Sequence, residues 1–468
     1  MRNMNRREWL LQTACGAGAL ILGAPATAQP GLRPPNIVFI LADDLGYGDL
    51  GCYGQKTIQT PRIDRMAREG LRFTQCYAGS TVCAPSRCAL MTGLHMGHAR
   101  VRGNKLVPLE PGDRTVAEIL RNAGYRTGLF GKWGLGEPET AGIPNRKGFD
   151  EFFGYLNQHH AHTYYPEYLW DNDKQAPLNN KDGEHENVAV ERNEYAPYLI
   201  ADQAIGFIER HQRSPFFLYF TPTLPHANNE RGAKLKDGME IPDYGIYQDR
   251  DWPDPQKGHA AMIALLDAQV GRVIDTLQAL GIAEETLVFF TSDNGTHKEG
   301  GGDPEFFQSS GPLRGYKRAL YEGGIRAPMI AWWPGTIPGG AESDLVWSHW
   351  DFLPTAAALA HAKAPAGLDG LSVAPTLLGR PRDQQQHDYL YWEFHEGGFA
   401  QALRQGDWKA VRPGKAGSAI ELYRLDEDPG ETRDLAGAHP EKVAAFEALF
   451  QSARVPSALF PVAGDGSV

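Results

Sequence analysis

The sequence is poor in cysteine, and its few cysteines are spaced unlike a structural framework. Five cysteines occur in 468 residues, and the first of them, Cys15, lies in an apolar N-terminal stretch. The other four, Cys52, Cys76, Cys83 and Cys88, form no C-x-x-C pair. The low count argues against a disulfide scaffold, and the spacing argues against a zinc site. A chemical role for one of these cysteines therefore remains open.

The chain also lacks an excess of positive charge. It contains 46 Lys and Arg against 57 Asp and Glu, which gives a formal net charge of -11. Proteins that bind nucleic acid in general carry a basic face, so we expect no nucleic-acid partner. An anionic substrate is not excluded, because a few cations that converge on one pocket dominate the local potential.

Long apolar runs are absent beyond the N-terminus. No later segment approaches the roughly 20 residues that a membrane helix needs, so we expect no membrane span in the mature protein. Residues 1–28 are typical of an export signal, because Arg6 and Arg7 precede an apolar stretch and a small-residue cleavage pattern at 26–28. The paired arginines indicate twin-arginine export, with ordinary Sec export as the alternative. Either signal predicts a periplasmic or extracellular protein.

Apolar strands alternate with amphipathic helices through most of the chain. Residues 36–42 are a continuous β-branched run, typical of a strand buried on both faces. A helix is predicted over 61–69, with proline in its first turn and Gly70 as its stop. The same signals predict further helices and strands: 116–122, 126–130, 216–220, 259–280 and 286–291. This alternation predicts an α/β fold with a large, doubly wound, mostly parallel sheet and helices on both faces.

The sequence pattern changes after about residue 382. Four short alternating segments that indicate strands follow: 389–392, 402–404, 408–411 and 421–423. A final helix over 441–451 completes a small C-terminal antiparallel sheet with one helix packed on it. We therefore predict a catalytic domain at 29–382 and an α+β subdomain at 383–468.

The segment 80–93 carries the strongest chemical signal. It contains C-x-P-S-R-x4-T-G, which begins at Cys83. Pro85 suits the first turn of a helix, so Cys83 would lie at the N-terminus of that helix, where free N–H groups and the helix dipole favour negative charge. Arg87 adds a cation at the same place. From the residues alone, Cys83 is a candidate thiolate nucleophile with a lowered pKa.

This motif resembles the maturation signature of the type I, arylsulfatase-like sulfatases of the alkaline phosphatase superfamily, in which the cysteine becomes formylglycine. The resemblance covers nearly the whole mature chain, and it implies a sulfatase and a formylglycine-generating maturation enzyme as its partner. Further segments resemble the family in the family's order: Asp43-Asp44, Gly131-Lys132-Trp133, Pro225-His226, Ser292-Asp293-Asn294-Gly295, Lys317, Tyr321-Glu322-Gly323-Gly324, Gly406-Asp407-Trp408-Lys409 and Asp428-Pro429-Gly430-Glu431.

Two polar pairs indicate a metal site independently of the resemblance. Asp43-Asp44 and Asp293-Asn294 each follow a predicted buried strand, and ligand sites in open parallel sheets collect at the carboxyl ends of the strands. Three carboxylates and one amide offer only hard oxygens, which suit Ca²⁺, or Mg²⁺, better than zinc. We therefore expect Asp43, Asp44, Asp293 and Asn294 to hold this ion, and the resemblance implies the side chain made from Cys83 as a further ligand. The alternative is that both pairs are polar strand-end caps.

The resemblance also implies a mechanism and a role for each cation. A hydroxyl of hydrated formylglycine-83, acidified by the metal, attacks sulfur, and the second hydroxyl later expels the covalent sulfate. Arg87 would hold the hydrated side chain, and Lys132 and Lys317 would bind the sulfate. His226 is the candidate acid for the leaving oxygen.

The sequence departs from the family pattern G-K-W-H-x-G at one position, where Gly134 replaces a histidine that contacts the hydrated formylglycine. We predict that a histidine of the segment 158–162 enters the site instead, with His162 as the first choice. The alternative is that these histidines line a substrate pocket or face solvent. His297 and Lys298 are further candidates for substrate contact, with a solvated loop as the alternative.

Two other functions fit parts of the sequence. A phosphonate or phosphate ester hydrolase of the same superfamily would share the metal edge. A sulfated-glycan-binding protein that has lost catalysis would explain Gly134, but the presence of every nucleophile, metal and sulfate position disfavours it. Tyr164, Tyr165, Tyr168 and Trp170 suit a carbohydrate ring, although such residues are more often core. We expect a sulfated small molecule or oligosaccharide as the substrate.

Overall fold

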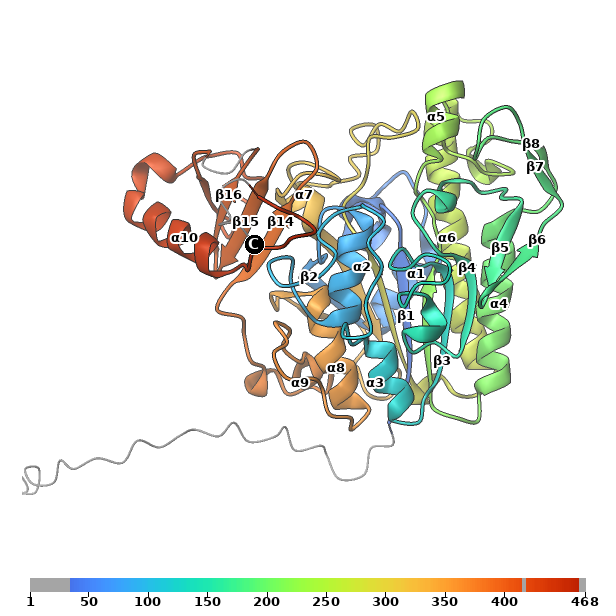
Figure 1. Cartoon of the computed structure of the whole chain (residues 1–468), viewed down its shortest axis with the longest axis horizontal. Coiled ribbons are helices and arrows are strands. Elements are labelled where there is room, and N and C mark those ends of the chain that lie inside the picture. The colour runs from blue at the N-terminus through green and yellow to red at the C-terminus, as the bar shows by residue number, and fades with distance from the viewer. Residues whose placement is uncertain (1–33, 415–417, 463–468) are drawn as a thin grey trace, which may run out of the picture. The chain divides into compact units, whose positions relative to one another are not determined.

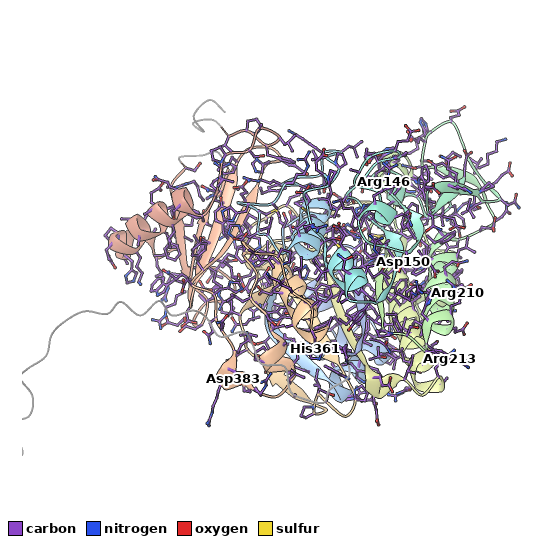
Figure 2. All side chains as sticks on the ribbon, turned by 60° about the horizontal axis from the view of Figure 1, so that its bottom comes forward. Arg146, Asp150, Arg210, Arg213, His361 and Asp383 are labelled. Carbon is purple, nitrogen blue, oxygen red and sulfur yellow. The ribbon has the colours of Figure 1, made fainter. Side chains whose placement is uncertain are left out.

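The computed structural model describes residues 34–414 and 418–462, which belong to one compact unit. The predicted export signal at 1–28 lies outside these residues. Among the described helices, none combines the length and the apolar character that crossing a membrane requires. Charged side chains such as Arg210, Arg213 and Asp383 extend from the exterior of this unit (Figure 2).

An 11-stranded sheet forms the centre of the fold (Figure 1). The strand order is β12-β2-β11-β10-β1-β9-β3-β4-β5-β6, with β13 beside β2. Strands β10, β1, β9, β3 and β4 are mutually parallel, and antiparallel pairs flank them on both sides. The strands of this sheet are β1 (Asn36–Ala42), β2 (Leu71–Tyr77), β3 (Arg126–Lys132), β4 (Glu151–Tyr155), β5 (Tyr168–Asp171), β6 (Lys174–Pro177), β9 (Phe216–Thr221), β10 (Thr286–Ser292), β11 (Arg326–Trp332), β12 (Ala341–Ser343) and β13 (Trp347–Ser348). The predicted large, doubly wound α/β sheet is confirmed.

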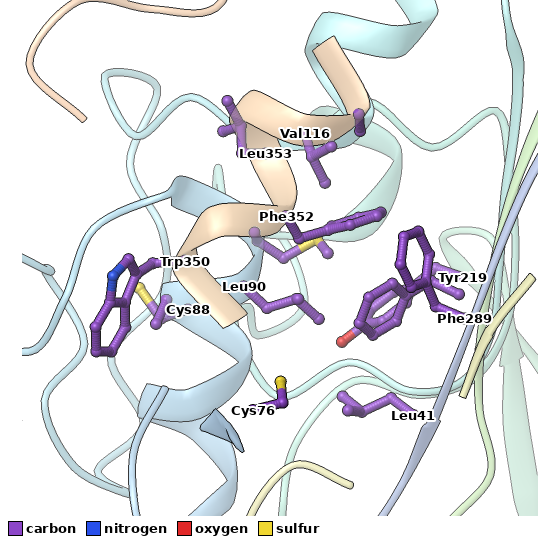
Figure 3. Close-up of a cluster of buried hydrophobic side chains, with 14 of the residues drawn as sticks. Leu41, Cys76, Cys88, Leu90, Val116, Tyr219, Phe289, Trp350, Phe352 and Leu353 are labelled. Atoms are coloured by element: carbon purple, nitrogen blue, oxygen red, sulfur yellow. The ribbon is translucent and has the colours of Figure 1, made fainter. Parts of the chain in front are cut away.

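Helices cover both faces of the sheet because its central strands are apolar on both sides. Phe39 and Leu41 of β1 pack into one hydrophobic cluster with α2, α3 and α8, which Figure 3 shows, and Val38 and Ile40 pack into a second cluster with α1, α4 and α6. The helices are α1 (Pro61–Glu69), α2 (Cys83–Thr92), α3 (Val116–Asn122), α4 (Ala196–His211), α5 (Asn229–Leu235), α6 (Asp254–Ala279), α7 (Glu322–Ile325), α8 (Phe352–Leu359), α9 (Ala374–Leu377) and α10 (Pro440–Ser452).

Helix ends differ from the sequence prediction where the first turn is polar. Helix α6 begins at Asp254, five residues before the predicted start at 259, because its first turns carry no apolar periodicity but do carry a favourable proline. Helix α3 begins where it was predicted. Its N-cap Thr115 accepts from the backbone N–H of Glu118 at 3.2 Å, and the Glu118 carboxylate accepts from the N–H of Thr115 at 2.9 Å.

The small C-terminal antiparallel sheet is also confirmed. It consists of β14 (Leu390–Phe394), β15 (Ala400–Gln405), β16 (Trp408–Arg412) and β17 (Glu421–Arg424). Phe446 and Phe450 of α10 pack against Tyr391 and Leu403 on this sheet. The remaining pair, β7 (Asn180–Asp182) and β8 (Ala189–Arg192), forms a separate two-stranded sheet. The division of the chain at 382/383 stays a prediction.

A buried ion network joins the C-terminal sheet to α7. The ammonium of Lys409 in β16 lies 2.9 Å from Oε1 of Glu322 and 2.9 Å from Oε1 of Glu431. The backbone N–H of Glu322 donates to Oε2 of Glu431 at 2.7 Å. Three segments that resemble the family, G-D-W-K, D-P-G-E and Y-E-G-G, therefore meet in one structural contact.

Two buried histidines predict loss of stability in acid. Burial lowers the pKa of His349 to about 3 and that of His95 to about 4. Between these values and the ordinary pKa near 6.5, the unfolded chain binds protons that the folded protein does not, so stability falls as pH decreases below 6.5. Each such histidine costs about 1.4 kcal/mol per pH unit in this window. Unfolding measured by urea from pH 7.5 to 5 is expected to show this slope.

His349→Phe is expected to make that slope shallower, whereas His185→Gln, at an exposed position, is expected to leave it unchanged. Equal slopes for wild type and His349→Phe would contradict the explanation.

Candidate active site

The two polar pairs predicted to hold a metal lie side by side at the carboxyl edge of the sheet. Strands β1 and β10 are parallel, with Ala42 opposite Ser292, so the residues that follow them meet. The N–H of Asp44 donates to Oδ1 of Asp293 at 3.1 Å, and Nδ2 of Asn294 donates to Oδ1 of Asp44 at 2.7 Å. These residues and Asp43 are fully buried.

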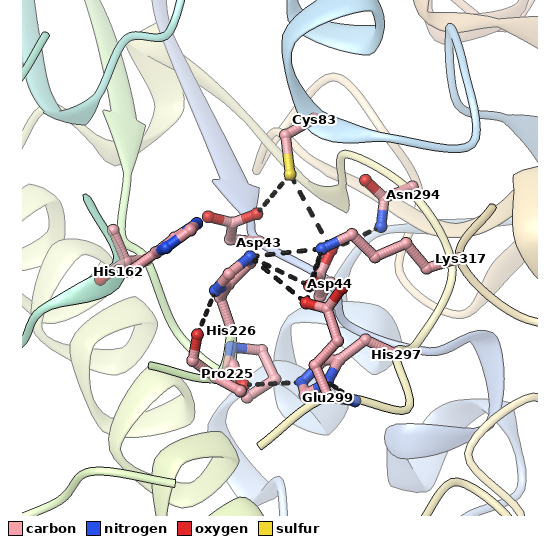
Figure 4. Close-up of polar contacts among 12 residues, drawn as sticks. Asp43, Asp44, Cys83, His162, Pro225, His226, Asn294, His297, Glu299 and Lys317 are labelled. Carbon is pink, nitrogen blue, oxygen red and sulfur yellow. Dashed lines mark hydrogen bonds and ion pairs between the residues drawn. The ribbon is translucent and has the colours of Figure 1, made fainter. Parts of the chain in front are cut away.

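Cys83 is the first residue of α2, as predicted, and its sulfur faces the carboxylates. Sγ lies 3.2 Å from Oδ1 of Asp43 and 4.0 Å from Oδ1 of Asp44 (Figure 4). Burial raises the pKa of the Cys83 thiol well above its ordinary value, and the charge of Asp43 raises it further. The idea of a low-pKa thiolate at the helix N-terminus is therefore wrong: two opposing effects outweigh the dipole, and an unmodified Cys83 stays protonated at neutral pH.

Each of three buried carboxylates has its own cation. Nε and Nη2 of Arg87 donate to Oδ2 of Asp293 at 3.0 and 2.8 Å. The ammonium of Lys132 lies 2.7 Å from Oδ2 of Asp43, and that of Lys317 lies 2.8 Å from Oδ2 of Asp44. Both lysines are buried, which excludes the solvated surface position that lysine usually takes.

The protonation of the carboxylates follows from burial and from these neighbours. Burial alone would raise the pKa of Asp43, but Lys132, His226 and Arg87 together lower it well below its usual range. The pKa of Asp293 rises to about 7, because burial and the charge of Asp43 outweigh Arg87. Arg87, Lys132 and Lys317 thus match the three carboxylates of the cluster one for one.

The residues present fit a hard divalent cation. The side chains of Asp43, Asp44, Cys83 and His226 offer ligand atoms within 4.8 Å of one another. Oδ1 of Asn294 is buried and has no hydrogen-bond partner among the described residues. An unpaired buried oxygen costs free energy that a cation at this point would recover. Carboxylate and amide oxygens favour Ca²⁺ or Mg²⁺ as that cation.

His226 lies against this cluster in a defined tautomer. Its Nδ1 donates to the carbonyl oxygen of Ala227 at 2.6 Å, so Nε2 is the nitrogen without a proton in the neutral ring. Nε2 lies 3.3 Å from Nζ of Lys317 and 3.5 Å from Oδ2 of Asp44. Burial lowers the pKa of His226 well below its ordinary value, and the charge of Lys317 lowers it further. In this arrangement His226 is neutral.

The other predicted contacts separate into two groups. His162 stacks on His226 with ring centroids 5.2 Å apart, and its Nδ1 is 3.0 Å from Oε2 of Glu230. His297 is buried, and its Nε2 lies 3.3 Å from the carbonyl oxygen of Pro225 beside His226. Lys298 is exposed, with its ammonium over the ring of Tyr316, and lies outside the cluster.

Glu299 also lies at the site, although no motif in the sequence indicates it. Its Oε2 is 3.2 Å from Nζ of Lys317, and its other oxygen pairs with Arg318. Burial raises the pKa of Glu299, but the charge of Lys317 outweighs this and brings the pKa to about 2. A charged residue directly before three glycines, at 300–302, was the available signal.

The comparisons with known proteins agree with this fold. Residues 35–362 match the Sulfatase family model, and residues 315–450 match the C-terminal model of N-sulphoglucosamine sulphohydrolase. The chain therefore belongs to the sulfatase family, within the alkaline phosphatase superfamily, and is a sulfuric ester hydrolase.

Three relatives place the chain within that family. It is 35% identical to human arylsulfatase A over 494 residues, which cover 93% of this chain and 90% of the relative. It is 33% identical to N-acetylgalactosamine-6-sulfatase of Sus scrofa over 497 residues, which cover 97% and 85%. The crystal structure of Ps i-CgsB with k-i-k-neocarrahexaose superposes with a TM-score of 0.76 at 26% identity, covering 90% of this chain and 92% of that one.

Proposed function

We propose that this chain is an exported, formylglycine-dependent sulfatase that removes sulfate from a carbohydrate. One observation carries the proposal: the side chain of residue 83 points from the N-terminus of α2 at Asp43 and Asp44, between the ammonium groups of Lys132 and Lys317. A protonated thiol is a poor nucleophile, and its burial beside carboxylates is better explained by conversion to another group.

The proposed nucleophile is the hydrated aldehyde that results when the Cβ of Cys83 is oxidised, with loss of sulfur, by a formylglycine-generating maturation enzyme. One hydroxyl attacks the sulfur of the ester, the S–O bond to the alcohol breaks, and the alcohol leaves with a proton. Deprotonation of the second hydroxyl then reforms the aldehyde and releases sulfate. A serine at 83 would instead retain a stable sulfate ester.

The residues of this chain prepare the site for that reaction. A divalent ion held by Asp43, Asp44, Asp293 and Asn294 would lower the pKa of the attacking hydroxyl. Arg87 holds Asp293 in place through two hydrogen bonds.

Two lysines and a histidine would act on the substrate itself. Lys132 and Lys317 are fixed cations that would stabilise the charge that develops on the sulfate oxygens. His226 reaches the same space through Nε2 and is the proposed proton donor to the leaving oxygen, because a bound anionic sulfate ester would raise its pKa.

A carbohydrate substrate is supported by the names of similar proteins. N-acetylgalactosamine-6-sulfatase is named for an amino sugar, and the structure of Ps i-CgsB contains an oligosaccharide. Twin-arginine or Sec export is proposed from residues 1–28 alone. The division into a catalytic domain at 29–382 and a subdomain at 383–468 is proposed from the sequence pattern.

The test combines turnover with a mass measurement. The protein is produced together with a maturation enzyme. The mass of the tryptic peptide 73–87 is then measured by mass spectrometry, because conversion of CH₂SH to CHO lowers it. Paired aryl sulfate and aryl phosphate esters are then compared. Converted peptide with preferred sulfate turnover supports the proposal, whereas an active protein with an intact thiol overturns it. Preference for the phosphate or phosphonate ester would favour the rival hydrolase instead.

Removal of the divalent ion is expected to abolish turnover, because the attacking hydroxyl loses its activation, and to lower Tm, because the ion binds the folded protein and Oδ1 of Asn294 would be left without a partner. Dialysis against a chelator, followed by Ca²⁺ or Mg²⁺, measures both effects. Each added ion is expected to restore Tm and turnover together. Full activity after verified removal of metal, by elemental analysis, would exclude the ion from the mechanism.

His162→Ala is expected to slow the reaction by about 10- to 100-fold, because the stacked ring and Glu230 hold His226 in its orientation and offer a second base. Burst kinetics separate the two steps: if His162 assists release, the covalent sulfoenzyme accumulates in the variant. His185→Ala, at an exposed position between β7 and β8, is the control. Unchanged turnover and no accumulation would remove His162 from the mechanism.

A further inference from the structure

Gln158 carries a buried carboxamide that has no partner. It follows β4, whose parallel neighbour β3 ends in the site residue Lys132. Its Nε2 and Oε1 are both buried, and neither has a hydrogen-bond partner among the described residues. A polar group that is buried and unpaired destabilises a fold, so such a group needs an explanation.

The carboxamide occupies the space in front of Gly134. A Cβ built on Gly134 would lie 2.0 Å from Nε2 of Gln158, and Gly134 has φ +84°, which disfavours any larger residue. The N–H of Gly134 donates to the carbonyl oxygen of Leu156 at 2.9 Å, which ties the loop after β3 to the loop after β4. Gly134 lies two residues beyond Lys132 and has no side chain, so the side chain of Gln158 fills the space in front of it.

The loop around Gln158 is well anchored, so the unpaired amide does not reflect a loose side chain. The neighbouring Asn157 uses both ends of its amide: Nδ2 donates to Oε2 of Glu137 at 3.0 Å, and Oδ1 accepts from the N–H of His160 at 2.9 Å. The same loop delivers His162 to the ring of His226. The chain thus fixes the loop and leaves one amide unpaired beside Gly134.

We propose that Gln158 is a substrate-contact residue whose Nε2 donates a hydrogen bond to an oxygen of the bound sulfate group. This inference rests on the proposed function. Sulfate oxygens accept hydrogen bonds strongly, and a neutral donor adds such a bond without a further charge beside Lys132 and Lys317. Oε1 then accepts from a hydroxyl group near the ester. The bound substrate, rather than the protein, then provides the hydrogen-bond partners of the Gln158 carboxamide.

The test uses Gln158→Met, which keeps the approximate length of the side chain and removes both polar atoms. Its matched control is Gln401→Met in β15, because Gln401 is buried but fully paired, with Nε2 2.8 Å from the hydroxyl of Tyr391 and Oε1 2.7 Å from Nη1 of Arg412. For each protein, kcat/KM for a sulfate ester, inhibition by inorganic sulfate, and Tm with and without sulfate are measured.

Gln158→Met is expected to lower kcat/KM by about 10- to 100-fold, to weaken inhibition by sulfate, and to lose the increase in Tm that sulfate causes in wild type, without a decrease in Tm of the free protein. Gln401→Met is expected to lower Tm and to retain kcat/KM per folded molecule.

If wild type turns over sulfate esters and Gln158→Met matches it in kcat/KM and sulfate inhibition, the proposed role of Gln158 is overturned, while the proposed function stands. A decrease in Tm like that of Gln401→Met, with unchanged kinetics, would likewise show a structural amide. A mature, metal-loaded wild type without sulfatase activity would overturn the proposed function itself.

Discussion

Cys83→Ala is expected to lower kcat for sulfate esters by at least about 10⁴-fold, because it removes the atom from which the covalent nucleophile is made. Sγ is the side-chain atom of α2 that faces Asp43 and Asp44. The alanine variant retains every cation and carboxylate of the site, so binding of inorganic sulfate is expected to persist. Steady-state kinetics at saturating substrate measure the loss, and circular dichroism checks that the fold is retained.

Cys88→Ala is the matched control, because Cys88 lies in the same helix and is equally buried, but its sulfur packs in the hydrophobic cluster beside Trp350 (Figure 3). It is expected to reduce stability slightly and to retain kcat. Cys83→Ser is expected to turn over once and to hold the sulfate as a stable ester, visible as added mass on the peptide 73–87. Multiple turnover by the alanine variant would overturn the formylglycine mechanism.

The sequence predicts where the two polar pairs lie in the sheet because the end of each strand is visible in its local pattern. A strand buried on both faces is visible in the sequence as an apolar run, and the first polar residues after the run mark where the strand ends. Asp43-Asp44 and Asp293-Asn294 could be assigned to one edge once β1 and β10 were predicted to be parallel. The antiparallel strands β11 and β2, which extend the sheet beyond β10, depend on pairings between distant segments that periodicity does not reveal.

Contacts between loops were the part of the site that could not be predicted. Glu299 pairs with Lys317 and Gln158 fills the space at Gly134, and both depend on how separate loops fold over the sheet edge. Lys298 and its neighbour His297 looked equivalent in sequence, yet one faces solvent and the other is buried. Adjacent residues of an irregular loop have no fixed period, so their directions follow from tertiary packing alone.

The incorrect prediction of a thiolate at Cys83 has a general physical cause. A helix N-terminus favours a negative charge by about 0.3–1 kcal/mol at exposed sites, whereas full burial shifts a pKa by up to several units. Sequence shows the helix end but not the burial or the carboxylate of Asp43 beside it. The same reasoning explains why Arg87, expected near residue 83, is held by Asp293: in a buried site, a cation pairs with the nearest carboxylate.

Lys409→Met is expected to lower the free energy of unfolding by about 3–5 kcal/mol, because it leaves Glu322 and Glu431 buried against each other without their shared cation. Lys409 is fully buried. Glu322 begins α7, just after the segment that carries Lys317, so the network also positions the residue that we propose binds the sulfate. Urea unfolding at pH 7.5 measures the loss, and kcat of the folded fraction is expected to fall as well.

Arg424→Met in β17 is the control for an ion pair of the same sheet that lies in solvent. Its side chain is 41% exposed beside Asp426, and ion pairs in solvent contribute little to stability. Lowering the pH provides a second check, because burial together with the charge of Glu322 already raises the pKa of Glu431 to about 7, and loss of Lys409 raises it further. A folded-state pKa above the unfolded value means that protonation favours the fold, so the difference between wild type and Lys409→Met is expected to shrink from pH 8 to pH 5. A loss as small as that of Arg424→Met would show that the network does not hold the C-terminal sheet to α7.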